Sequence, residues 1–153
     1  MLRVTQTESI QAFVDRYAAA LQRLDVSATA EFYSLPCSFI GNAGVVVQQD
    51  RDGLESLIAG LFGRYRAIDF GKADVTALRV EILSAHLHQA RAHWQLIAID
   101  GSALYDFETI YVIANFGKGH RITAVIVVNE AERYKALIQQ IAGERTFIGK
   151  LPK

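Results

Sequence analysis

The chain has 153 residues, of which 51% are hydrophobic and 21% are charged. These proportions are those of a folded domain rather than a disordered segment, and the length fits one domain with a substantial core. The 16 basic and 16 acidic residues cancel. No basic surface is therefore expected for phosphate groups, so we predict a single domain over residues 1–153 without a nucleic-acid partner.

Features of a targeting or membrane-spanning segment are missing from the sequence. No apolar run approaches the roughly 18 residues that a membrane span requires, and the first residues do not combine a basic segment with an apolar one. The single cysteine, Cys37, cannot form an internal disulfide, which fits a reducing compartment. We expect a cytoplasmic protein without membrane contact, and a buried, unreactive thiol at Cys37.

Two helices are predicted at the start of the chain. Residues 5–8, Thr-Gln-Thr-Glu, have the form of a capping box. Apolar residues then recur at helical spacing over residues 10–24, so one face of this helix is expected to be buried. A second, shorter helix over residues 25–33 follows, with Asp25 or Ser27 as its cap.

Two further helices are predicted later in the chain. The third begins at Asp52 and has an apolar stripe at helical spacing: Leu54, Leu57, Ile58, Leu61, Phe62 and Tyr65. Gly60 and Gly63 interrupt this helix, and close packing on a sheet would explain them. The last helix covers residues 130–142, and its stripe consists of Tyr134, Leu137, Ile138 and Ile141.

Strands make up most of the second half of the sequence. A short hairpin over residues 38–48 lies between the second and third helices. Four strands follow, over residues 78–83, 87–99, 104–116 and 121–128. Glycines between them supply the positive φ that tight turns require, so the pattern predicts an antiparallel meander.

Alternation of residue types assigns faces to the two central strands. In the first, the apolar face contains Ala90, Ala92, Trp94, Leu96 and Ala98. In the second, the aromatic set consists of Tyr105, Phe107, Thr109, Tyr111 and Ile113. If these residues face inward, Asp106 and Glu108 are surface carboxylates. A bulge would exchange the two faces of the strand and bring both carboxylates inside.

The last strand is apolar on both faces, although the outer face of an antiparallel sheet is normally polar. The C-terminal helix or the same sheet of a second subunit could cover it, since an exposed β-branched patch favours aggregation. We expect a homodimer through the convex sheet face. Replacing Val125 or Val127 with lysine would then give monomers or insoluble protein.

Histidines raise the question of a metal site. His86 and His88 share one face of a strand and His93 lies on the other, so the three do not converge. His120 falls in a predicted turn and is expected to be solvated. We therefore predict no metal and no other cofactor.

The order of helices, hairpin and meander resembles the nuclear transport factor 2-like superfamily, also called the SnoaL-like or cystatin-like α+β fold. The resemblance covers nearly the whole chain. It implies a strongly curved antiparallel sheet wrapped around the N-terminal helices, an NTF2-like cone, with a ligand pocket inside. The same cone serves isomerases, dehydratases, hydrolases, cyclases and proteins without catalysis, so the resemblance does not imply one reaction.

Residues 14–21, Val-Asp-Arg-Tyr-Ala-Ala-Ala-Leu, resemble the first helix of ketosteroid isomerases. In that family a tyrosine of this helix donates to an oxyanion, and two aspartates complete the site. Tyr17 matches the tyrosine. The position of the general base falls near Gly41 and that of the second aspartate near Tyr111, so two of the three groups are missing and this chemistry is not expected.

Two functional hypotheses follow, and a third remains open. The first is binding of a small hydrophobic molecule in an aromatic pocket lined by Phe13, Tyr17, Phe39, Trp94 and Tyr111. The second is a lyase, isomerase or hydrolase for a cyclic apolar substrate, with Tyr17 as donor and Asp106 or Glu108 as base. The third is an assembly module whose cone is filled by side chains. An ionisable group inside the cone near Tyr17 would distinguish an enzyme from a binding protein.

Overall fold

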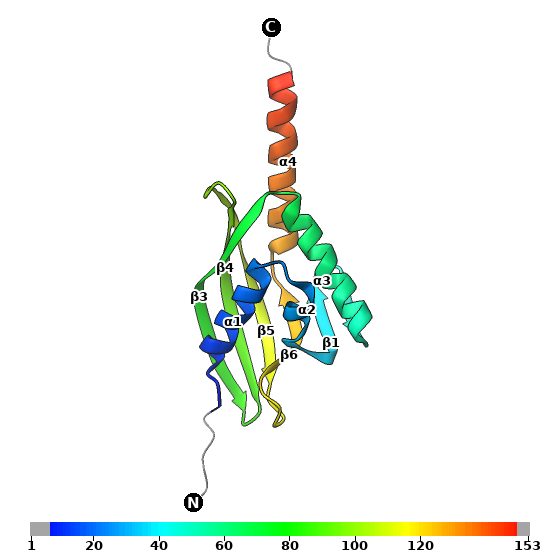
Figure 1. Ribbon diagram of the computed structural model, residues 1–153, viewed down its shortest axis with the longest axis vertical. Helices are drawn as coiled ribbons and strands as arrows, with labels where there is room; N and C mark the ends of the chain where they lie inside the picture. The colour runs from blue at the N-terminus through cyan, green and yellow to red at the C-terminus, as the bar shows by residue number, and fades with distance from the viewer. Residues whose placement is uncertain (1–6, 150–153) are drawn as a thin grey trace, which may run out of the picture.

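The computed structural model describes residues 7–149, and the side chains of residues 7–145. The described part has the following elements: α1 (Ile10–Gln22), α2 (Val26–Ala30), β1 (Tyr33–Gly41), β2 (Gly44–Gln48), α3 (Arg51–Arg66), β3 (Phe70–Ser84), β4 (Leu87–Ala98), β5 (Ala103–Ala114), β6 (Arg121–Val127) and α4 (Glu130–Gly149). Figure 1 shows a strongly curved sheet with α1 and α2 lying against one face. The predicted α+β class and helix-wrapping sheet are confirmed.

The six strands of the described chain form one open sheet in the order β2-β1-β6-β5-β4-β3. The meander from β3 to β6 is antiparallel, as predicted, and β2 pairs with β1 in the same sense. Only the β1–β6 pair is parallel. This pair joins the predicted hairpin to the last strand of the meander, so all strands belong to one sheet.

The helix starts differ in detail from the prediction. Ser9 caps α1, because its hydroxyl accepts the backbone N–H of Ala12 at 3.0 Å. Residues 5 and 6 of the predicted capping box lie outside the described residues, and Glu8 instead binds Arg16 at 2.6 and 2.7 Å. The carboxylate of Asp50, rather than Asp52, caps α3.

Asp25 caps α2 as predicted, but this helix ends at Ala30. Tyr33, assigned from sequence to the end of the helix, is the first residue of β1 and pairs with Ile122 of β6. The pairing partner lies far along the chain, so the local pattern around Tyr33 could not show that this residue belongs to the sheet.

The apolar stripe of α3 is confirmed, because Leu54, Ile58, Phe62 and Tyr65 are buried. The explanation given for the glycines of this helix is wrong. Gly60 and Gly63 lie on the exposed side, and a Cβ added at Gly63 would meet no neighbouring atom within 4 Å. These glycines therefore lower the helical propensity of α3 without allowing any close approach.

Replacing Gly63 with alanine should raise the free energy of unfolding by about 1 kcal/mol, because alanine favours the helix and has free space here. Urea denaturation followed by circular dichroism would measure the change. Gly71→Ala is the matched control, since its Cβ would lie 2.9 Å from the backbone of Ile99. That variant should be destabilised, and a loss of stability in both variants would contradict the placement of Gly63.

Strand β3 begins at Phe70, earlier than the predicted start at residue 78. Its register against β4 shifts between Phe70 and Lys72 and again between Val75 and Ala77. Such irregularities break the two-residue alternation of side chains, so this part of the strand had no clear pattern in the sequence. The extension carries β3 along the whole length of β4.

The predicted faces of β4 and β5 are confirmed. Trp94 is 1% exposed, and the aromatic residues of β5 are buried. The two carboxylates of β5 lie on the outer face. Asp106 binds His93 at 2.8 Å, and Glu108 accepts a hydrogen bond from Arg91 at 2.7 Å.

The two valines chosen from sequence for the interface, Val125 and Val127, do not lie on the convex face of β6. Tyr111 pairs with Val125 and Thr109 with Val127, so both valines lie on the inner face. Ile126, opposite Ile110, lies on the outer face. The cause is a register shift between β5 and β6, which displaces the alternation by one residue.

Helix α4 extends beyond the end of the sheet and does not fold back over its outer face (Figure 1). Tyr134, Leu137 and Ile141 of the predicted stripe pack against the edge of the core. The described part of this helix therefore leaves the convex face of the sheet uncovered. Among the described helices, none combines the length and apolar character needed to cross a bilayer.

Candidate functional site

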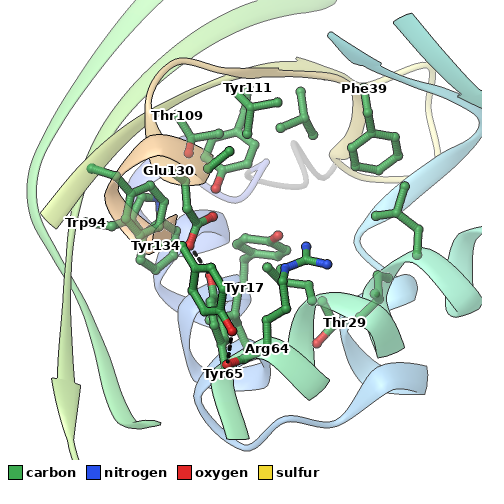
Figure 2. Close-up of a pocket in the computed structure, with 18 of the residues that line it drawn as sticks. Tyr17, Thr29, Phe39, Arg64, Tyr65, Trp94, Thr109, Tyr111, Glu130 and Tyr134 are labelled. Carbon is green, nitrogen blue, oxygen red and sulfur yellow. Dashed lines mark hydrogen bonds between the residues drawn. The ribbon is translucent and has the colours of Figure 1, made fainter. Parts of the chain in front are cut away.

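A cavity of about 370 Å³ lies between the concave face of the sheet and helices α1, α3 and α4. Nine of the 20 residues of its wall are aromatic, several of which Figure 2 shows, and they come from six elements: Tyr17, Tyr33, Phe39, Tyr65, Trp94, Tyr105, Phe107, Tyr111 and Tyr134. The cavity has the size of a small-molecule site. Side chains therefore do not fill the cone completely.

Four of the five predicted ligand-binding residues line this cavity, namely Tyr17, Phe39, Trp94 and Tyr111. Phe13 is not part of the wall. Its ring is 1% exposed and packs edge-on against Phe32, with 5.4 Å between the ring centroids. The burial of Phe13 was correctly predicted by helical periodicity, but this pattern cannot distinguish a core residue from a cavity residue.

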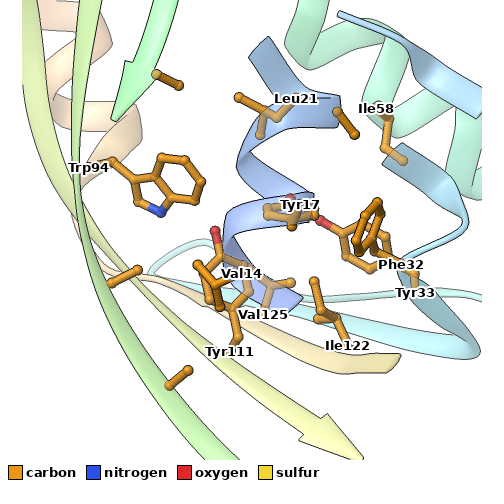
Figure 3. Packing of buried hydrophobic residues seen from close by; sticks show 14 of the residues in the cluster. Val14, Tyr17, Leu21, Phe32, Tyr33, Ile58, Trp94, Tyr111, Ile122 and Val125 are labelled. Carbon is orange, nitrogen blue, oxygen red and sulfur yellow. The ribbon is translucent and has the colours of Figure 1, made fainter. Parts of the chain in front are cut away.

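Tyr17 forms a hydrogen bond with Tyr33 that joins the two hydroxyl oxygens at 2.5 Å (Figure 3). Burial raises the pKa of both phenols well above their usual range. Both side chains therefore stay neutral at physiological pH. Tyr17 therefore cannot act as an anionic base.

Glu130 brings a carboxyl group into the same cavity. The hydroxyls of Tyr65 and Tyr105 both donate to its Oε2, at 2.7 and 2.9 Å. Burial raises the pKa of Glu130, and the two tyrosine hydrogen bonds offset part of this effect by stabilising the charged form. Glu130 therefore keeps its proton to a higher pH than an exposed glutamate does.

Sequence reasoning missed this group of residues. Glu130 follows the last strand and opens the predicted C-terminal helix, where a glutamate is favoured by the helix dipole and needs no other explanation. Tyr65 and Tyr105 were assigned to buried stripes of a helix and a strand. The pair Asn129-Glu130 at a strand end was the only local sign of a polar pocket group.

The indole N–H of Trp94 lies beside the hydroxyl of Tyr111, and this hydrogen bond opposes part of the rise that burial causes in the pKa of Tyr111. Oγ1 of Thr29 has no hydrogen-bond partner within the described chain. Both polar atoms are fully buried, so a ligand in the cavity would contact them only after a movement of the wall.

The other candidate residues lie elsewhere. Because Asp106 and Glu108 face outward, neither can act as a base in the cavity. The Cys37 thiol is buried and donates to the carbonyl of Ile122 at 3.6 Å, and burial raises its pKa to about 12, so it is unreactive as predicted.

The histidines do not combine into a metal site. Among the described residues, no three side chains of the usual ligand types come together. His93 binds the outer carboxylates. The prediction for His120 was wrong, since it is 5% exposed and its Nε2 donates to the carbonyl oxygen of Glu8 at 2.6 Å.

Comparison with known families agrees with this architecture. Residues 7–130 match the family described as NTF2-like protein (DUF6841). The chain belongs to this NTF2-like family. A search of curated proteins found no match.

Solved structures with the same fold include two proteins of unknown function. An NTF2-like protein from Shewanella oneidensis has a TM-score of 0.61 and 16% identity, covering 78% of this chain and 95% of that one. A cystatin-like domain from Nostoc punctiforme has a TM-score of 0.63 and 15% identity, covering 90% and 94%. The β subunit of a benzoate 1,2-dioxygenase from Burkholderia mallei has a TM-score of 0.61 and 19% identity, covering 82% and 92%. At these identities the similarity shows that the NTF2-like fold is shared, and it carries no information about activity.

Proposed function

We propose that this NTF2-like domain binds a small, flat and largely apolar molecule in the aromatic cavity. The observation that carries the proposal is the cavity of about 370 Å³ itself, whose wall has rings from α1, α3, β1, β4, β5 and α4. Aromatic walls favour planar ligands because ring contacts add to the free energy of burying apolar surface. An assembly module would have a cone filled by its own side chains, and the presence of the cavity argues against such a filled cone.

The few polar atoms of the wall would orient the ligand. The carboxyl group of Glu130, whose Oε2 accepts from Tyr65 and Tyr105, can accept a further hydrogen bond from the ligand through Oε1. Glu130 and Arg64 contribute the charged groups of the wall. A mostly apolar site with a small number of polar groups is the usual composition of a specific small-molecule site.

Titration with planar ring compounds should quench the fluorescence of Trp94, which is the only tryptophan of the chain and lies on the cavity wall. A panel of steroid-like, terpenoid and polyketide-like compounds would be used, and quenching should saturate for some of them. Leu61→Phe, which adds volume at the wall, should weaken binding by about tenfold or more, or about 1.4 kcal/mol.

The control for this titration is Ser56→Ala, because Ser56 lies on the exposed side of the same helix. Its affinity should equal that of the unmodified protein. A fluorescence signal that is indifferent to the whole panel would contradict the proposed function.

A second candidate function is acid–base catalysis on a cyclic apolar substrate, by a lyase, isomerase or hydrolase. The observation that favours it is Glu130, an ionisable carboxyl group inside the cavity with a raised pKa. Glu130 would take the role first considered for Asp106 and Glu108. Recovery of a bound ring compound unchanged after long incubation with excess protein would favour binding over catalysis.

We further propose that the protein forms a homodimer through the convex face of its sheet. An apolar row crosses four strands there, because Val45 pairs with Ile40, Ile40 with Ile126, and Ile126 with Ile110. Val45 is 62% exposed. The strands beside this row have Arg91 and His93 paired with carboxylates, so the face has an apolar centre and a polar border, as protein interfaces do.

A cytoplasmic location forms part of the same proposal. It is supported by the single thiol of the sequence, which is buried at Cys37 and forms no disulfide.

A further inference from the structure

Glu130 forms no ion pair among the described residues, although burial raises its pKa and the positive charge of nearby Arg64 offsets part of that rise. The ion pairs found within residues 7–145 do not include it. Its two hydrogen bonds come from neutral hydroxyls, those of Tyr65 and Tyr105, and both end on Oε2. Figure 2 shows the carboxyl group directed into the cavity. Oε1 therefore remains available to a ligand.

Aromatic rings line the same cavity as this carboxyl group. Trp94 and Tyr17 lie close together, with ring centroids 6.2 Å apart, and Tyr105 and Tyr134 form a second pair at 6.4 Å. All four rings line the cavity. The face of an aromatic ring carries partial negative charge and attracts a cation, most strongly in tryptophan. Rings and carboxylate together attract a positive charge, and Arg64, the other charged residue of the wall, forms no ion pair with Glu130 within the described chain.

We propose that the ligand of this cavity is a flat apolar amine, whose protonated nitrogen binds Oε1 of Glu130 while its rings lie against Trp94 and Tyr17. This inference rests on the proposed binding function and specifies its ligand class. The amine places a positive charge directly against the carboxylate, and Tyr65 and Tyr105 hold the carboxylate in position from the opposite oxygen. A carboxylate ligand held by Arg64, which also lines the cavity, is the competing possibility.

The inference also predicts how binding depends on pH. The groups around Glu130 are Arg64 and Tyr65 of α3, Tyr105 and Tyr111 of β5, Tyr17 of α1 and Tyr134 of α4. Burial raises the pKa of Tyr17, Tyr65 and Tyr105, so these phenols stay neutral. Loss of the Glu130 proton as pH rises should therefore strengthen amine binding and leave a neutral ligand unaffected.

Tryptamine, tryptophol and indoleacetic acid test this directly, because they share one ring system and differ in carrying an amine, a hydroxyl or a carboxylate. Isothermal titration calorimetry at about pH 7.5 should show tryptamine binding about tenfold or more tighter than tryptophol, as a hydrogen bond to a charged group allows. As pH rises through the raised pKa of Glu130, the affinity for tryptamine should increase while that for tryptophol stays constant.

Glu130→Gln is the decisive variant, because its amide oxygen can still accept from Tyr65 and Tyr105 while the negative charge is lost. Tryptamine affinity should fall to that of tryptophol, and tryptophol affinity should remain the same. Asp106→Asn, which removes a carboxylate on the outer face, is the matched control and should change neither. If Glu130→Gln does not fold, the pH series on the unmodified protein provides the same test.

The outcomes separate this inference from the proposed function. Equal affinity for tryptamine and tryptophol, or failure of all three indoles while ring compounds still quench Trp94, overturns the amine inference and leaves the binding function intact. If indoleacetic acid binds most tightly of the three, the amine inference is also overturned, and Arg64 is the group that holds the ligand. If the whole ring panel fails as well, the proposed function itself is contradicted.

Discussion

Replacing Leu54 with alanine should lower the free energy of unfolding by about 2–5 kcal/mol, the usual cost of removing a buried leucine side chain. Leu54 is 1% exposed and lies on the face of α3 that packs into the core. The change removes apolar contacts and leaves a cavity that the closely packed surroundings can fill only in part.

Urea denaturation followed by circular dichroism would measure the effect, with Ser56→Ala as the control on the exposed side of the same helix. The control should change stability by no more than about 0.5 kcal/mol, as surface substitutions usually do. Similar losses at Leu54 and Ser56 would mean that the helical phase of α3 is wrong.

Replacing Ile126 with lysine should convert the proposed dimer into a folded monomer. Ile126 lies at the centre of the apolar row on the convex face, between Ile40 and Ile110. In a dimer with twofold symmetry the substitution would place two lysine charges in the interface, each without a partner. The cost of burying these charges should exceed the free energy that holds the dimer together.

Light scattering at micromolar concentration would measure the mass of both proteins. The matched control is Ser84→Lys, which adds the same charge at an exposed strand end away from the apolar row. The unmodified protein and the control should have the mass of a dimer. A monomeric unmodified protein, or a soluble dimer of Ile126→Lys, would each contradict an interface on this face.

The inner-facing valines of β6 give a different expectation. Val125 is 6% exposed and lies on the cavity wall, so Val125→Lys should unfold the protein rather than dissociate it. The distinction between these two neighbouring positions depends on one register shift between β5 and β6. A sequence pattern with a period of two cannot locate such a shift, because both faces of this strand are apolar.

Local periodicity alone determined much of the fold. The stripe of α3 and the inward direction of Trp94 and Tyr111 follow from side-chain spacing within a single element, which each segment of sequence contains in full. The cap of α2 at Asp25 is equally local. Tyr17 was placed in the pocket from the resemblance of its helix to a known family, and the cavity wall includes it.

Only the tertiary structure decided where the polar group of the pocket lies. Glu130 meets a tyrosine 65 residues earlier and another 25 residues earlier, and no spacing rule links these three positions. Their meeting depends on the curvature of the sheet and on the point where α4 leaves β6. The raised pKa of Glu130 likewise results from burial by distant segments, because desolvation depends on everything that surrounds a group in space and not on its neighbours in sequence.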